Sequence, residues 1–574
     1  MPNTSNFKTL DEEVRENILA SVDVPHIRFA PKETKEAFEL YKKSVSRKDR
    51  QSAADAASRA EAAAKQSLSE LCGALQNVSP KAAIQLLYGE RHDCLHDYKL
   101  PKGGEIFSLY RGAWLIGVFG NGTDDSQYGA LIAFNKYVRW VAAYLIKLHI
   151  ATFADLDDTE CLASFLPSQL EISRLVEPET RMMWIVDEIS ASIGRWVDNN
   201  LPTVSDLIGS KPMEVAAKNI HEAVSSLWSA YSDKKTAIEE PYSATLLKDI
   251  PEGLIRALTA RRPTALSEAS VEEALLGEES TTTPFVHIED TTWVLNRSAW
   301  LDHRDDVLFR FAMKESPRDK EGQVFEDVTA SMLRKWGPRE VAWKSSVDLL
   351  SPKSRKCKDE IDIFGCSDDI AFIGECKANR LSRNNLSVGV SFETVVLNKA
   401  VSQLETRITH WYEGWRPGGI NPCKASEAIG FAITFSSYGG MLWQSESLIK
   451  EDAPVQHAVI PLHSLIFAVS ILDGPQDLKR YLEYREAFIT SGAVNHDELE
   501  YMLTFIAALK GLKVTIPKNL LDENARILFI QYELDEEGKS IDPRKYSDRP
   551  DWKQQFRDDL WDNIKPVTPS LADL

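Results

Sequence analysis

Apolar residues recur at helical spacing through the first part of the chain. Residues 51–75 are rich in alanine and poor in β-branched residues, and the same kind of pattern marks residues 136–154, 179–199 and 213–232. Apolar positions three and four residues apart form one stripe on a helix, and alanine has the highest helix propensity. We therefore predict a largely α-helical N-terminal region over residues 1–262.

The pattern changes after this region. Residues 263–290 are rich in Ser, Thr, Glu and Pro, a composition typical of a linker. Residues 291–471 alternate short apolar runs with helical segments, which predicts an α/β domain with a mixed sheet. Residues 472–574 are predicted to form a mostly helical C-terminal extension, polar and loosely packed from Asp535 onward.

Two short runs within the α/β region predict a β-hairpin. Residues 360–366 and 370–377 are separated by Ser367, Asp368 and Asp369, and the two aspartates serve as the turn. With this turn, Asp362 faces Glu375 across the pair. Residues that face each other share one side of the sheet, with Cβ atoms about 5 Å apart. Lys377 lies two residues after Glu375 and therefore on the same side.

The predicted neighbours carry like charges. Two adjacent carboxylates repel unless a proton or a cation lies between them, so Asp362 and Glu375 favour a bound divalent ion. Oxygen ligands select hard ions such as Mg²⁺ or Mn²⁺. Such an ion lowers the pKa of bound water and neutralises a phosphoryl oxygen, while Lys377 orients the water. This combination favours phosphodiester hydrolysis.

Two helices are predicted on either side of the hairpin. Residues 322–336 have helical apolar spacing and end at a Gly-Pro pair, and Glu326 lies in the first turns. Residues 392–415 have the same spacing and contain Gln403.

These residues, in this order, resemble the PD-(D/E)xK nuclease superfamily, which has the restriction-endonuclease-like fold. The resemblance covers residues 320–471, and its matching positions are Glu326, Asp362, Glu375, Lys377 and Gln403. The chain departs from the family pattern in one place, because Ile361 stands where the family name has a proline.

The resemblance implies a Mg²⁺-dependent endonuclease, with Mn²⁺ as a substitute. Asp362, Glu375, the backbone carbonyl of Cys376 and, directly or through water, Glu326 would hold the ion. Lys377 would position the attacking water and Gln403 would support the site. The implied partner is nucleic acid, with DNA favoured over RNA. Large relatives with unrelated N-terminal regions suggest a homo-oligomeric bacterial restriction or anti-phage effector that its helical region regulates.

Two alternatives stay open. An E-x-K triplet occurs by chance in many proteins, so the chain could be a degenerate nuclease-fold protein that binds nucleic acid or scaffolds a complex without cutting. In the other alternative, the helical N-terminal region recognises a protein partner and controls the nuclease.

Basic residues flank the hairpin in an otherwise acidic chain. The net charge is −19, but residues 314–424 hold 18 Lys and Arg against 16 Asp and Glu, so the acidic excess lies elsewhere. Six basic residues are candidates for phosphate contact rather than a solvated loop. They are Lys353, Arg355, Lys356, Lys358, Arg380 and Arg383.

Composition predicts a cytoplasmic protein. The chain has 574 residues and 43% hydrophobic content, and we expect no signal peptide and no membrane span, because the most apolar stretch, residues 140–153, is short and interrupted by Lys147. Seven cysteines without a CxxC pair favour free thiols in a reducing compartment.

Two further motifs receive structural interpretations. His92, Cys94 and His96 lack a second ligand pair with zinc-finger spacing, so we interpret them as a structural cluster. The glycines of residues 112–122 are followed by no GK[ST] sequence, which favours close packing or a turn over phosphate binding.

Overall fold

A computed structural model of the chain contains two compact units. The helical unit comprises Ile18–Glu179 and Ile193–Glu315, and the sheet unit comprises Met1–Asn17, Thr180–Ser192 and Ser316–Leu574. The structure describes residues 25–47, 49–89, 108–154, 182–201, 212–232, 250–277, 279–317, 321–353, 358–378, 398–418, 423–435, 457–490, 502–503, 505–506, 531–534, 541–546, 548–549 and 551–567.

The helical unit confirms the helices predicted from apolar spacing. Its elements up to residue 257 are η2 (Pro25–Phe29), α2 (Lys32–Ser46), α3 (Arg50–Asn77), α4 (Ala82–Tyr88), α5 (Leu109–Phe119), α6 (Gln127–Ala154), α10 (Met213–Ser232) and α12 (Glu252–Ala257). Helix α8 (Met183–Asn200) belongs partly to each unit.

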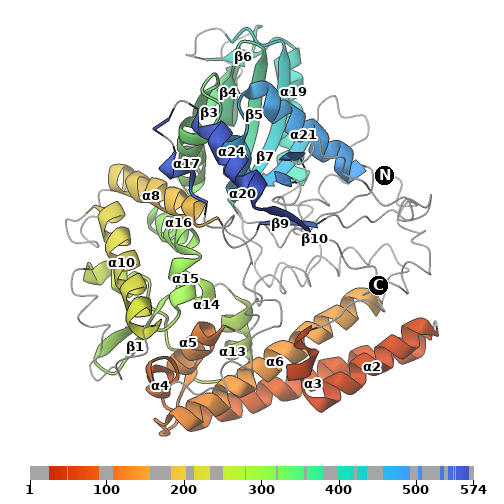
Figure 1. The fold of residues 1–574 in the computed structure, drawn as a ribbon, viewed down its shortest axis with the longest axis vertical. Helices are drawn as coiled ribbons and strands as arrows, with labels where there is room; N and C mark the ends of the chain where they lie inside the picture. The colour runs from red at the N-terminus through yellow and green to blue at the C-terminus, as the bar shows by residue number, and fades with distance from the viewer. Residues whose placement is uncertain are drawn as a thin grey trace. The chain divides into compact units, whose positions relative to one another are not determined.

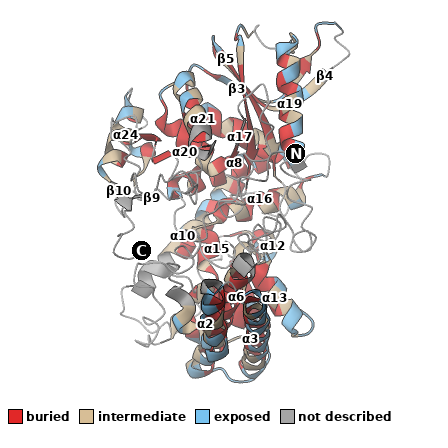
Figure 2. Ribbon diagram, turned by 90° about the vertical axis from the view of Figure 1, so that its right-hand side faces the viewer, coloured by how far each residue is buried: buried red, intermediate tan, exposed pale blue. Residues whose placement is uncertain are grey.

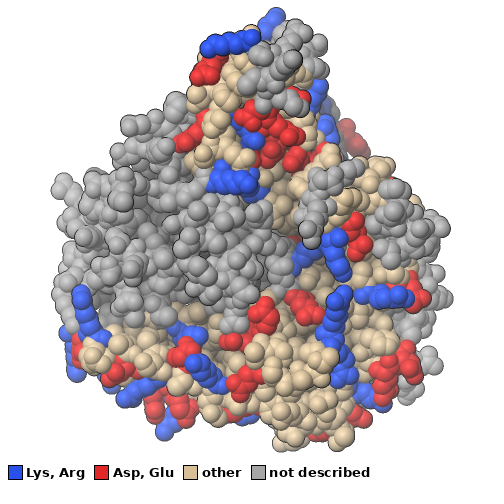
Figure 3. All heavy atoms as spheres, turned by 180° about the vertical axis from the view of Figure 1, so that it is seen from behind, with Lys and Arg blue, Asp and Glu red and all other residues tan. Residues whose placement is uncertain are grey.

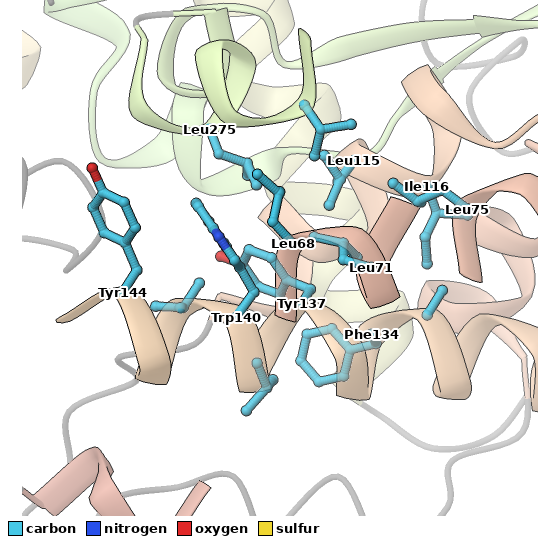
Figure 4. Packing of buried hydrophobic residues seen from close by; sticks show 14 of the residues in the cluster. Leu68, Leu71, Leu75, Leu115, Ile116, Phe134, Tyr137, Trp140, Tyr144 and Leu275 are labelled. Atoms are coloured by element: carbon cyan, nitrogen blue, oxygen red, sulfur yellow. The ribbon is translucent and has the colours of Figure 1, made fainter. Parts of the chain in front are cut away.

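The core of this unit forms where α3 packs along α6. Alanines let the two helices approach closely, and Leu68 and Leu71 of α3 lie beside Tyr137 and Trp140 of α6 (Figure 4). Leu75 lies beside Ile116 of α5. Figure 2 shows exposed residues along the outer faces of α2 and α3, whereas α6 is mostly buried. The chain therefore separates apolar from polar faces, as its spacing predicts.

Close packing explains two of the glycines in residues 112–122. A Cβ atom on Gly112 would lie 2.5 Å from the Phe134 ring, and one on Gly117 would lie 2.4 Å from the Leu295 side chain. Both distances are too short for any other residue without movement of the neighbour. The packing interpretation of these two positions is confirmed.

Residues 263–290 do not form the linker that their composition predicts. They contain α13 (Glu268–Leu276), α14 (Glu279–Thr282) and β1 (Phe285–Ile288), which pairs with β2 (Thr291–Val294). Val271 and Leu275 are buried in the same core cluster as α3 and α6. A few apolar residues at helical spacing thus outweigh an otherwise polar composition. Helices α15 (Arg297–Leu301) and α16 (Arg304–Glu315) complete the described part of this unit.

The sheet unit contains the expected mixed sheet. The described strands are ordered β6-β3-β4-β5-β7-β8 (Figure 1). Strands β3, β4 and β5 are antiparallel, whereas β5, β7 and β8 are parallel. Their bounds are β3 (Ala342–Leu350), β4 (Lys358–Cys366), β5 (Ile370–Lys377), β6 (Arg416–Pro417), β7 (Glu427–Thr434) and β8 (His457–Pro461).

Two helices cover the sheet on opposite faces. Helix α17 (Glu321–Trp336) packs against β3, and its Thr329 interacts with the Cys376 side chain. Helix α19 (Asn398–Tyr412) contacts the next residue of the same strand, Lys377. Because successive residues of a strand point to opposite faces, the two helices lie on either side of β5. Both helices were predicted from their apolar spacing.

The C-terminal part is better packed than its polar composition predicts. Its elements are α20 (Leu462–Ile471), α21 (Pro475–Thr490), β9 (Gln531–Leu534), η8 (Pro543–Lys545), α24 (Trp552–Asp562) and β10 (Ile564–Val567), with β9 and β10 paired. Trp552, Phe556 and Leu560 of α24 are buried, four residues apart, and the Trp552 ring lies 5.6 Å from that of Trp336. One apolar stripe is sufficient to attach this helix, so the prediction of a loosely packed tail is wrong for α24.

A disulfide contradicts the prediction that all cysteines are free thiols. Cys366, at the end of β4, is bonded to Cys423 in the segment before β7. The two residues are 57 positions apart in sequence, so no short sequence motif indicates that they pair. Among the described residues, Cys72 and Cys376 remain free. No helix in the described parts of the chain is long and apolar enough to cross a membrane.

Candidate functional site

The register of the β4–β5 hairpin agrees with the prediction. Phe364 pairs with Ile373 and Ile363 pairs with Gly374, as a two-residue turn requires. The ladder ends there, one pair before Asp362 and Glu375. The Asp362 carboxylate instead accepts a hydrogen bond of 2.8 Å from the backbone N–H of Cys376. Asp362 therefore lies at the open end of the hairpin, beside the strand that carries Glu375.

The Glu375 carboxylate is buried between two cations. It forms ion pairs with the Lys377 ammonium and with the Arg407 guanidinium of α19, and all three side chains are buried. The Lys377 Nζ atom also donates to Gln403 Oε1 at 2.9 Å. The structure thus brings Glu375, Lys377 and Gln403 together, as the sequence predicts.

Arg407 is a residue of this site that the sequence analysis missed. It lies one helical turn after Gln403, at i+4 on α19, so both side chains project from the same face of the helix. Its Nε atom is also 3.9 Å from Asp359 Oδ1. The i+4 spacing from Gln403 is the signal that could have identified it.

Glu326 reaches the site from α17. Its Oε2 atom accepts a hydrogen bond of 2.7 Å from the Ser346 hydroxyl of β3. The pKa of Glu326 is raised from 4.5 to about 7, chiefly by burial. The hydrogen bond from Ser346 lowers this pKa, and the neighbouring charges of Asp362, Glu360 and Asp327 contribute to its rise. Glu326 is consequently close enough to Asp362 for the two carboxylates to repel.

Burial opposes charge at the other ionisable groups as well. Burial raises the pKa of Asp362. The hydrogen bond from the Cys376 N–H and the positive charges of Arg407 and Lys377 lower this pKa and so reduce the rise. Burial also lowers the pKa of Lys377, which the negative charges of Asp362 and Glu326 counteract. These mutual effects place Glu326, Asp362 and Lys377 in one electrostatic environment.

The donor chemistry of the site fits a hard divalent ion. Its ligand atoms are carboxylate oxygens, and the raised pKa values of Glu326 and Asp362 indicate carboxylates that a cation would stabilise in the ionised form. Among the described residues, however, no group of three or more His, Cys, Asp or Glu side chains is arranged to hold a metal. Magnesium typically takes one or two protein carboxylates and keeps its waters, so three converging ligands are not required.

Only some of the predicted phosphate contacts lie within the described structure. Lys353 is exposed after β3, and Lys358 begins β4. Arg355, Lys356, Arg380 and Arg383 lie outside the described residues, as do His92, Cys94 and His96. Figure 3 shows basic and acidic side chains interspersed over the described surface of one face. Phosphate contact by these basic residues stays a prediction.

Comparison with known proteins identifies no relative. No family model matches the chain, and searches of curated proteins and of solved structures give no significant match.

Proposed function

We propose that this chain is a metal-dependent nuclease that hydrolyses phosphodiester bonds of nucleic acid, with DNA as the favoured substrate. The contact of Lys377 with both Glu375 and Gln403 carries the proposal. A buried lysine held between a carboxylate and an amide, beside two more carboxylates, is an arrangement that can orient water and stabilise the charge that develops in phosphodiester hydrolysis.

The order of elements supports the same proposal. Helix α17, the antiparallel strands β3, β4 and β5, helix α19 and the parallel strand β7 follow one another along the chain. The part of this order from α17 to α19 is the one that the resemblance to the PD-(D/E)xK superfamily implies. The resemblance therefore rests on topology as well as on single residues.

The residues that would hold Mg²⁺ are Asp362, Glu375, the backbone carbonyl of Cys376 and Glu326, the last directly or through water. When bound, the ion would lower the pKa of a coordinated water and neutralise charge on a phosphoryl oxygen. Glu375 currently faces Lys377 and Arg407, so it would have to release one of these partners to become a ligand.

Lys377 has the most direct role in the proposed reaction. Gln403 and Glu375 fix its ammonium group, which reduces the number of positions that a flexible lysine would otherwise sample. Its charge would orient the attacking water and stabilise the negative charge that develops on the phosphate. The lowered pKa of Lys377 also makes proton transfer to or from this group easier at neutral pH.

A cleavage assay tests the proposal. Wild type, Lys377→Ala and the control Lys399→Ala, an exposed lysine of α19, are incubated with plasmid, single-stranded DNA and RNA in Mg²⁺, Mn²⁺ or EDTA. We expect wild type and Lys399→Ala to cut in a metal-dependent way and Lys377→Ala to lose at least about 100-fold in rate. Equal cutting by all three proteins would contradict the site assignment.

One observation favours a second candidate function, that of a nuclease-fold scaffold that does not cut. Arg407 and Lys377 already neutralise Glu375, so the charge that would attract an ion is partly satisfied within the protein. In this case wild type would cleave none of the substrates and would still bind nucleic acid in EDTA. Mobility-shift measurements with the same substrates separate the two functions.

A further inference from the structure

We propose that Ser346 is a positioning residue that fixes the Glu326 carboxylate for the divalent ion of the proposed nuclease site. The inference rests on the proposed function and adds a residue that neither the sequence pattern nor the family resemblance assigns. Three observations carry it: the backbone conformation of Ser346, its place opposite Asp362, and the direction of its hydroxyl.

The backbone of Ser346 is strained. Its φ angle is +48°, in the left-handed region, although it lies in the middle of β3. Glycine, asparagine and aspartate adopt this region far more readily than serine, so the conformation destabilises the folded chain at this position. Strain of this kind persists where the surrounding structure imposes it, and it is concentrated at functional sites.

The strained residue lies directly opposite Asp362. The β3–β4 ladder passes from the pair Ser345 and Ile363 to the pair Val347 and Ile361, and it skips the position between them. That position is Ser346 opposite Asp362. The β4–β5 ladder also ends just before Asp362. The distortion of β3 therefore opens the sheet at the acidic residue that we place at the centre of the site.

The Ser346 hydroxyl points at a second acidic residue of the site. It donates a hydrogen bond to Glu326 Oε2 at 2.7 Å. This bond fixes the orientation of the carboxylate and is made to Oε2 rather than to Oε1. Carboxylates that bind metals are commonly held in this way by a neighbouring hydrogen-bond donor. One serine thus connects Glu326 to the strand position beside Asp362.

A neighbouring contact shows that attachment of α17 does not require this distortion. The Ser345 hydroxyl donates to Asp327 Oδ1, also at 2.7 Å, and Ser345 keeps ordinary ladder pairing with Ile363. Adjacent residues of β3 thus make the same contact with adjacent residues of α17. Because Ser345 attaches the helix to the strand without strain, the strained contact of Ser346 points to a role at Glu326.

Calorimetric titration with Mn²⁺, without substrate, tests this role. Ser346→Ala and Ser346→Gly remove the hydroxyl, and both are expected to weaken Mn²⁺ binding by about 10-fold or more. Glycine adopts a φ of +48° without penalty, so Ser346→Gly should unfold at the same or a higher temperature than wild type. Ser345→Ala is the matched control, which should lower the unfolding temperature and leave Mn²⁺ affinity unchanged.

The outcomes distinguish this inference from the proposed function. If wild type and Ser346→Gly bind Mn²⁺ equally well, Ser346 does not position a ligand, while the proposed nuclease is unaffected. The same conclusion follows if Glu326→Gln binds as wild type does. If wild type binds no Mn²⁺ at all, both the inference and the proposed function are overturned.

Discussion

Single charged residues of the candidate site are held where burial opposes their charge. Glu326 and Asp362 have raised pKa values, and Lys377 has a lowered one, chiefly because each is removed from water. Burial of such groups lowers the stability of the fold. Perturbed pKa values nevertheless cluster at functional sites. The next two predictions measure how the charge of Glu326 and the ion pair of Arg407 with Glu375 change the free energy of unfolding.

Glu326→Gln should gain stability relative to wild type as the pH rises. The folded protein holds the proton of Glu326 up to a pKa of about 7, whereas the unfolded chain releases it near 4.5. Between these values the folded state binds more protons than the unfolded state, so wild type loses stability with rising pH. Glutamine does not titrate. Urea unfolding in EDTA from pH 4 to pH 8 measures the difference, and a constant difference would contradict the raised pKa.

Arg407→Ala should destabilise the sheet unit. It removes one of two cations from the buried Glu375 carboxylate, and loss of one partner of a buried ion pair costs about 3 kcal/mol. Lys377 still faces the carboxylate and limits the loss. Lys399→Ala, on the exposed face of the same helix, should change the free energy of unfolding by less than about 0.5 kcal/mol. Equal effects of the two substitutions in chemical denaturation would rule out a strong pair.

The sequence identified the residues whose positions follow from spacing. Glu375 and Lys377 alternate on one strand, and the turn length places Asp362 beside them. Ser346 was missed, because a left-handed backbone at a serine leaves no trace in the sequence. Arg407 was missed, because its i+4 spacing from Gln403 was not used to find further residues on the same face of α19.

At the scale of elements, the hairpin is fixed by close contact between its strands. A Cβ atom on Gly374 would lie 2.9 Å from Ile363 Cβ and 3.3 Å from the Phe431 ring. Gly374→Ala should therefore force β4 and β5 apart next to Glu375, at a cost of about 1–3 kcal/mol.

Thermal unfolding measures this cost, with Gly474→Ala as the control in the same unit. A Cβ atom on Gly474 meets nothing within 4 Å, so this variant should unfold close to wild type. A Gly374→Ala protein as stable as the control would show that the strands have room to move.

The disulfide should stabilise the sheet unit in the absence of reductant. It joins the end of β4 to the segment before β7 and closes a loop of 57 residues, which restricts the unfolded chain. Cys423→Ser should lower the free energy of unfolding by about 3 kcal/mol under oxidising conditions. With dithiothreitol, wild type should fall to the level of the variant. No difference between the two proteins without reductant would mean that the bond does not form.

Elements were predicted well where a regular apolar pattern marks them. Helices α10 and α17 and strands β4 and β5 coincide with their predicted ranges to within a few residues. Helix α24 was misjudged, because only three residues, four positions apart, are buried in an otherwise polar stretch. Average composition conceals a single apolar stripe, whereas spacing reveals it.

At the scale of the whole molecule, the chain forms two compact units, and the charged residues of the candidate site lie in only one of them. Buried apolar residues hold the helical unit together. Residues 263–290 belong to this unit, because Val271 and Leu275 are part of its core. The sheet unit carries the charged site. The proposed function rests on the chemistry of Glu326, Asp362, Glu375 and Lys377 in this unit.

Anomalous diffraction from crystals soaked in Mn²⁺ tests the central claim most directly. We predict an anomalous peak in contact with carboxylate oxygens of Asp362 and Glu375, at roughly 2 Å, the ligand distance of ions of the magnesium type. Arg407 should then have moved away from Glu375. Peaks only at other residues at saturating Mn²⁺, with Glu375 still paired with Arg407, would contradict the account.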